Sequence, residues 1–76
     1  MDITAEATQH GAMYHRGGEV AEVWRNRLST GDTDWWLFIY TAEGVCTDAS
    51  LFDSEEQAAG TLADHWEVDS LPEVAR

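Results

Sequence analysis

The fold of this 76-residue chain is decided by the sequence DWWLFIYT at positions 34–41. A stretch so rich in aromatic and branched residues favours a β-strand. Because successive side chains of a strand point to opposite faces, both faces of this strand are apolar. The two sets are Trp35, Leu37 and Ile39 on one side and Trp36, Phe38 and Tyr40 on the other. We therefore expect a central strand with apolar contacts on both of its faces.

The residues after this strand indicate a hairpin and then a helix. A tight turn with a glycine at 42–44 leads into a returning strand at 45–52. Asp53 is expected to cap the helix, because its carboxylate can accept hydrogen bonds from first-turn amides while Glu56 reaches back. Apolar residues then recur at three- and four-residue steps and form a stripe that can dock on the sheet. The stripe consists of Ala58, Ala59, Leu62, Ala63 and Trp66.

The residues before the central strand indicate two further extended segments. A turn at 29–33 separates the central strand from the stretch 19–28, and Gly17-Gly18 is typical of a hairpin that leads back to 12–16. The stretch 19–28 also fits a helix, because its apolar residues can share one helical face. These residues are Val20, Val23, Trp24 and Leu28. Strand is the preferred interpretation of 19–28, and helix stays open.

These elements predict an α+β fold in which an antiparallel sheet of three or four strands packs against one C-terminal helix. The length allows a single small domain over 1–76. Residues 1–10 show no clear period, and Pro72 marks the end of the regular pattern. We therefore expect an ordered core over about 11–69, with 1–10 and 70–76 frayed.

A single helix can cover only one face of the central strand. The other face needs a cover of its own, because a large exposed aromatic patch is a liability for a soluble protein. Residues 1–16, or the long side chains of Arg25 and Arg27, could supply that cover from within the chain. The alternatives are a second copy of the chain, which makes a homodimer possible, or a partner protein.

Charge sets the class of partner. The chain has 15 Asp and Glu against 4 Lys and Arg, so its formal net charge is −11. This balance argues against charge-driven binding to nucleic acid or to an anionic membrane. All eleven acids of 28–75 lie in a stretch without Lys or Arg, so one flank should be strongly negative. No transmembrane segment or signal peptide is apparent, and we expect a cytoplasmic protein.

The reactive side chains fit no enzyme, metal site or cofactor site. Cys46 is the only cysteine, and its stretch has no basic side chain to stabilise a thiolate. His10 and His15 lack the paired ligand spacing of a zinc site. The pair Asp32 and Asp34 is followed by an apolar run that cannot supply the other oxygens of a calcium loop. We expect a protein without catalytic activity, metal or cofactor.

The acids suggest competition with nucleic acid for a basic groove on a protein or ribonucleoprotein complex. Charge would speed the encounter, and an aromatic cluster would add close contacts. The candidate partner-binding residues are the acids Glu43, Asp48, Asp53, Glu55, Glu56, Asp64, Glu67 and Asp69 and the aromatics Trp36, Phe38 and Tyr40. The alternatives are an interaction subunit or homodimer that uses the aromatic face, and an acid-rich housekeeping or halophile protein with no basic target.

In size, acidity and element order, the chain over 11–69 resembles the phage-encoded anti-CRISPR proteins. These proteins share no sequence motif, so the resemblance assigns no role to any residue. It implies a non-enzymatic inhibitor that acts in the host cytoplasm. The implied target is a type I CRISPR surveillance complex, whose DNA binding would be blocked.

Overall fold

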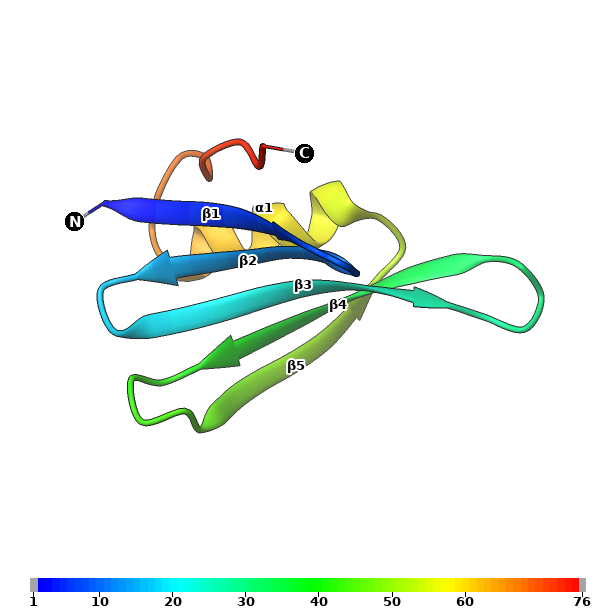
Figure 1. The fold of residues 1–76 in the computed structure, drawn as a ribbon, viewed down its shortest axis with the longest axis horizontal. Helices are drawn as coiled ribbons and strands as arrows, with labels where there is room; N and C mark the ends of the chain where they lie inside the picture. Colours follow the sequence, from blue (N-terminus) through cyan, green and yellow to red (C-terminus); the bar gives the residue numbers. More distant parts are fainter. Residues whose placement is uncertain (1, 76) are drawn as a thin grey trace.

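The computed structural model describes residues 2–75 and confirms the α+β arrangement. One helix packs on a five-stranded antiparallel sheet (Figure 1). The strands lie side by side in chain order, so every connection between neighbours is a hairpin. The elements are β1 (Ile3–Thr8), β2 (Gly11–Arg16), β3 (Glu19–Arg27), β4 (Thr33–Tyr40), β5 (Cys46–Phe52) and α1 (Glu55–His65).

The expected fraying of 1–10 is wrong over Ile3–Thr8, which form the edge strand β1, and the first residue of that range lies outside the described residues. This strand raises the strand number from the expected three or four to five. It pairs with β2 from Ile3 opposite Arg16 to Thr8 opposite Gly11. Ile3 and Ala5 pack against the core from this strand. Their alternation with polar residues was a strand signal, but small alanine side chains make that signal weak.

The stretch 19–28 is a strand over most of its length, which removes the helical alternative. In β3, Ala21 lies opposite Ile39 of β4 and Val23 lies opposite Leu37. All four of these side chains are buried. The 2-residue period of the strand places them on one face, and that face packs under the helix.

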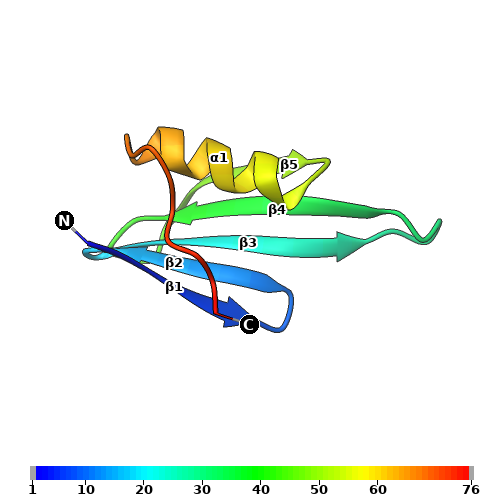
Figure 2. The ribbon, with the colours of Figure 1, turned by 90° about the horizontal axis from the view of Figure 1, so that it is seen from above.

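The hydrophobic core lies between this face of the sheet and α1 (Figure 2). Most of the predicted apolar stripe is confirmed, since Ala58, Leu62, Ala63 and Trp66 are all buried. Ala59 is only half-buried, at the border of the stripe. Trp66 is the largest side chain of the core and is 1% exposed.

The C-terminal segment extends the core, although it has no regular secondary structure. Leu71 and Val74 pack against the core residues, so the expected fraying is wrong over 70–75. Figure 2 shows this segment running from the end of α1 back across the molecule to β1. It passes on the helix side of the sheet, where it lies beside Tyr14 of β2.

The helix begins one residue later than the sequence predicts. Ser54, not Asp53, is the N-cap, and its hydroxyl accepts a hydrogen bond from the amide of Gln57 at 3.1 Å. The Gln57 side chain in turn accepts from the amide of Asp53, also at 3.1 Å. Gln57 therefore takes the reciprocal role expected of Glu56. Asp53 and Ser54 are both good capping residues, so their order alone does not decide between them.

Removal of the cap tests this assignment. Ser54→Ala should lower the free energy of unfolding by about 1 kcal/mol, because it leaves a first-turn amide without its partner. For a domain of this size that loss corresponds to a melting temperature about 4–8 °C lower. Asp53→Ala, which removes a carboxylate near the helix start, should cost only about 0.3 kcal/mol. Thermal melts followed by circular dichroism measure both; a larger effect at Asp53 would restore it as the cap.

Candidate binding surfaces

The acids and aromatics predicted to bind a partner lie on opposite sides of the sheet. In β4, Leu37 and Ile39 are buried beneath α1. Trp36, Phe38 and Tyr40 alternate with them and therefore point away from the helix. Six of the eight candidate acids lie in α1 or the segments that flank it, namely Asp53, Glu55, Glu56, Asp64, Glu67 and Asp69. The structure thus has two separate candidate surfaces.

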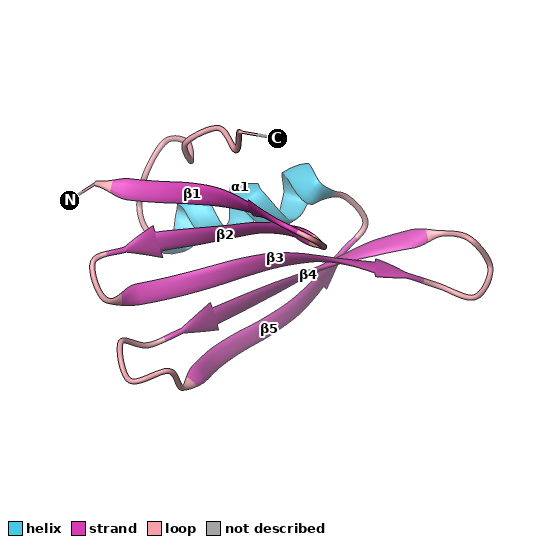
Figure 3. Ribbon diagram, in the orientation of Figure 1, coloured by secondary structure: helices cyan, strands magenta, loops and turns pink. Residues whose placement is uncertain are grey.

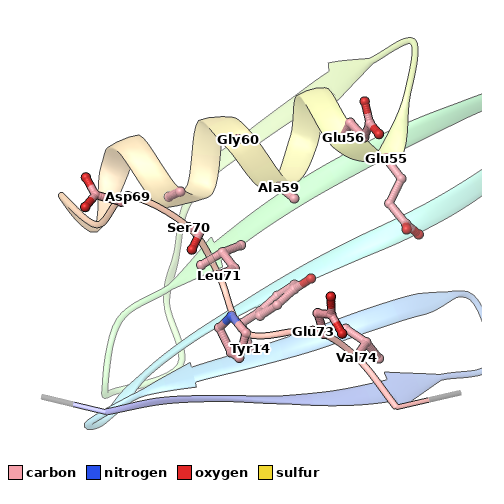
Figure 4. A pocket seen from close by; sticks show the side chains of 12 residues that line it. Tyr14, Glu55, Glu56, Ala59, Gly60, Asp69, Ser70, Leu71, Glu73 and Val74 are labelled. Atoms are coloured by element: carbon pink, nitrogen blue, oxygen red, sulfur yellow. The ribbon is translucent and has the colours of Figure 1, made fainter.

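The acids at the start of α1 help to stabilise the fold. Glu55 and Glu56 lie in the first turn, where the positive end of the helix dipole attracts carboxylates. Glu55 is half-buried, and Figure 4 shows its side chain directed toward the sheet, whereas Glu56 points away from it. Asp53 is exposed immediately before the cap. The position of these three acids is explained by helix stability alone.

The acids at the other end of α1 lie where they oppose helix stability. Glu67 does not continue the helical face of Glu56 and Asp64, because the helix ends at His65. Glu67 is the one non-glycine residue of the described chain with a positive φ, at 58°. Its amide donates to the carbonyl of Asp64 at 3.1 Å, and the amide of Val68 donates to the carbonyl of Ala63 at 2.9 Å. This pair of bonds is a Schellman motif.

Glycine is the preferred residue at the position of Glu67. A left-handed conformation costs a residue with a Cβ about 1–2 kcal/mol. A carboxylate near the negative end of the helix dipole, as in Asp64 and Glu67, is also unfavourable. Both side chains are exposed, so neither is retained for packing. The chain therefore retains negative charge here at a cost in stability.

Two open grooves flank α1, and carboxylates line both. The first lies between the helix and the C-terminal segment, with Tyr14 on its floor (Figure 4). Its acids are Glu55, Glu56, Asp69 and Glu73. The second lies toward the end of β5, and its acids are Asp53, Asp64 and Asp69. Asp69 borders both grooves. Glu73 was missed by the sequence prediction because its segment was expected to be frayed.

Seven acids make up what we call the helix-side acidic surface. They are Asp53, Glu55, Glu56, Asp64, Glu67, Asp69 and Glu73. No Lys or Arg occurs in 28–75, and the arginines on the helix side of the sheet come from β3, as Arg25 and Arg27. Among the described residues, His15 Nε2 lies at hydrogen-bond distance, 3.2 Å, from Glu6 Oε1, and this contact is an ion pair when the imidazole is protonated. That pair is carried by β1 and β2, away from this surface.

The remaining two candidate acids lie apart from this surface. Glu43 is exposed in the turn between β4 and β5. Asp48 is exposed on the edge strand β5, where its carboxylate accepts hydrogen bonds from the Ser50 hydroxyl at 3.2 and 3.3 Å. Neither lines a groove beside α1.

We call the face of the sheet away from α1 the open sheet face. A continuous aromatic band lies on it. Trp36 and Phe38 stack with ring centroids 5.6 Å apart. Trp24 of β3 lies opposite Trp36, and the His10 ring stacks on Trp24 at 4.0 Å. All five rings of this band, including Tyr40, are only half-buried.

The structure rules out the two segments of the chain that could have covered this face, namely the N-terminal residues and the side chains of Arg25 and Arg27. Residues 3–8 and 11–16 are strands within the sheet and therefore cannot lie across it. Arg25 lies opposite Trp35, so strand alternation places it on the helix side, and Arg27 shares that side. Among the described residues, the His10 ring stacks on Trp24, but no segment of the chain lies across the open sheet face.

Within residues 2–75 nothing is arranged as a metal centre, since no group of three or more His, Cys, Asp and Glu could hold an ion. Cys46 is exposed, and its thiol donates to the carbonyl of Asp48 at 3.3 Å. No helix in this range is long and apolar enough to span a membrane.

Comparison with protein-family models, curated proteins and solved structures finds no match to the chain. The functional argument therefore rests on the two surfaces themselves.

Glu67→Gly tests the strain at the end of α1. Glycine adopts a positive φ without the Cβ penalty, and the substitution also removes a charge that opposes the helix dipole. We expect the free energy of unfolding to rise by about 1 kcal/mol. Chemical denaturation measures this change. Glu43→Gly provides a control in an exposed turn, and a Glu67→Gly variant that is no more stable than the parent would contradict the assignment of strain.

Tyr40 on the open sheet face should make stability depend on alkaline pH. Partial burial raises the pKa of its phenol above the usual 10.0, and repulsion from Cys46 and Glu22 raises it further. Because the folded pKa is raised, this contribution to stability is present below about pH 10 and lost as the pH rises through the folded pKa. Urea denaturation at about pH 9 and about pH 11 should therefore show a smaller loss for Tyr40→Phe than for the parent. Equal losses would contradict the shift.

Proposed function

We propose that this protein is a non-enzymatic inhibitor that binds a basic, nucleic-acid-handling protein complex through its helix-side acidic surface. The observation that carries the proposal is the presence of Asp64 and Glu67 at the end of α1, where negative charge, and at Glu67 also the backbone conformation, opposes stability. Proteins commonly sacrifice stability at the residues that perform their function. A binding role would explain why carboxylates occupy these positions, which folding does not explain.

The helix-side acidic surface presents clustered negative charge to a basic groove. Helix α1 has 11 residues and is therefore about 16 Å long. A DNA duplex carries about ten phosphate charges over that length. The helix itself carries three carboxylates, and its flanks add four more. A groove that binds phosphates would therefore meet part of the charge of a duplex on this surface.

The proposed target is a type I CRISPR surveillance complex, with the DNA-binding surface as the occupied site. This target follows from the chain's resemblance to anti-CRISPR proteins in size, charge and element order. Such an inhibitor would act in the cytoplasm of the host cell. It would bind neither nucleic acid nor an anionic membrane directly, because both repel a protein with a net charge of −11.

The location of the charge, rather than its total, is the feature to test. Asp64→Asn with Glu67→Gln removes two charges from the helix-side acidic surface. Asp32→Asn with Asp34→Asn removes one charge in the β3–β4 loop and one at the start of β4, at the far end of the molecule from the end of α1 (Figure 1). Both pairs change the net charge equally, so a difference between them reports position. Asp64 and Glu67 are preferred over Glu55 and Glu56, whose substitution would also weaken the helix.

We expect the Asp64/Glu67 variant to inhibit DNA binding by a purified type I surveillance complex about tenfold less well than the parent. The Asp32/Asp34 variant should stay within about twofold of the parent. Raising NaCl from about 0.05 to 0.5 M should weaken the parent complex, mainly by slowing association. Binding and electrophoretic mobility assays measure these effects. Equal losses for both variants, or no inhibition by the parent, would overturn the proposal.

The same salt series separates inhibition from an adaptation to a saline cytoplasm. A halophilic protein would require molar salt for full stability, because screening relieves its internal repulsion. The proposed inhibitor should show a cooperative unfolding transition at low salt.

A further inference from the structure

We propose that the open sheet face is a dimerisation surface on which a second copy of this chain packs, sheet against sheet. The proposal concerns the face opposite the helix-side acidic surface. It stands independently of the proposed inhibitory function.

The open sheet face has the composition of an interface core. Cross-strand partners line up in rows across it, with Trp24, Trp36 and Leu51 in one row and Met13, Glu22, Phe38 and Ala49 in the next. Leu51 is 49% exposed, and the aromatic side chains are partly exposed. Aromatic residues and methionine are enriched at protein interfaces, and clustered aromatics supply most of the binding energy.

No described segment of the chain is available to cover this face. Both elements outside the sheet, α1 and the C-terminal segment, lie on its helix side (Figure 2). The N-terminal residues are used in β1, within the sheet. A cover must therefore come from another molecule.

Charge is compatible with a second copy at this face. Two chains at −11 repel each other, so contact between copies is least unfavourable on a surface with few acids. The strand residues of the open sheet face include three acids, Glu6, Glu22 and Asp34, and Glu6 already pairs with His15. A basic partner would instead be drawn to the acids around α1. Sheet-to-sheet contact is the arrangement that keeps those acids far apart.

Area and twist also fit a second copy. Five strands about 4.8 Å apart and six to nine residues long make a face of roughly 24 by 25 Å, or about 600 Å² before side-chain relief. A stable dimer buries about 800 Å² on each partner. Tryptophan and phenylalanine side chains that project from the sheet add surface to the flat area and bring it close to that value. Sheets of the same twist pack aligned, with interdigitating inner faces. A second copy of the chain has the same twist because it has the same fold.

Sedimentation equilibrium of the intact protein tests the proposal directly. Over about 5 to 500 µM the mass should rise from that of one chain, 8.5 kDa, toward twice that value. Raising NaCl should strengthen this dimer, because it screens the repulsion between like-charged copies. The complex with a basic target should weaken under the same change. The opposite salt responses keep a failure of the dimer distinct from a failure of the inhibitor.

Matched variants locate the interface. Phe38→Glu introduces a charge at the centre of the open sheet face and should weaken the dimer by about 30-fold or more. Val45→Glu makes the same kind of change at an exposed turn residue and should leave the dimer intact. Circular dichroism confirms that each variant folds.

Substitution of Glu22 should strengthen the dimer, whereas Phe38→Glu should weaken it. A variant that fails to fold could not give a tighter dimer. Its carboxylate lies within the aromatic rows and would lose hydration on dimerisation. Glu22→Gln should therefore tighten the dimer by about tenfold. Glu43→Gln removes the same charge from an exposed turn and should change the affinity by less than about twofold.

A parent protein that remains monomeric at about 500 µM and high salt would overturn the proposal. A dimer that Val45→Glu disrupts as strongly as Phe38→Glu would also overturn it, because the contact would then lie elsewhere. Stable binding of a different protein on the open sheet face, blocked by Phe38→Glu while the parent stays monomeric, would assign the face to that partner instead.

Discussion

The pairing of β3 with β4 is the interaction on which the rest of the structure depends. It places Val23 against Leu37 and Ala21 against Ile39, and these side chains form the floor on which α1 docks. The same register places Trp24 against Trp36 on the other face. A shift by one residue would exchange the two faces and leave the helix without its floor. The register between β3 and β4 therefore determines both which side chains form the core and which lie on the open sheet face.

The strongest sequence signals were those with a large side chain or a clear period. The strand predicted at 34–41 and observed at Thr33–Tyr40, the hairpin after it and most of the apolar stripe of α1 could be predicted. The first strand was missed because Ala5 and Ala7 bury little surface and give a weak alternation. Ser54 could not be separated from Asp53 as the cap, because both have the same chemistry and the choice depends on how the loop enters the helix.

The candidate site shows the same division between local pattern and tertiary context. Alternation in β4 already assigned Trp36, Phe38 and Tyr40 to one face, but the location of the acids depended on where the helix ended. That end is set by the Schellman motif and by Val68, which packs on the core, so no local pattern gives the conformation of Glu67. Glu73 became a candidate only once its segment was found beside Tyr14. Residue types indicated the chemistry, and packing decided which residues act together.

The sequential order of the strands has a consequence for biosynthesis. Each strand pairs with the one made just before it, so the sheet can form during translation from short-range contacts, which favour rapid folding. The helix is made last, and until it leaves the ribosome the nascent sheet has no cover on either face. Such a species is prone to aggregate. The first three strands carry Glu6, Glu19 and Glu22 against Arg16, Arg25 and Arg27, so their net charge is near zero, and repulsion between neighbouring nascent chains depends on the acids that are made later.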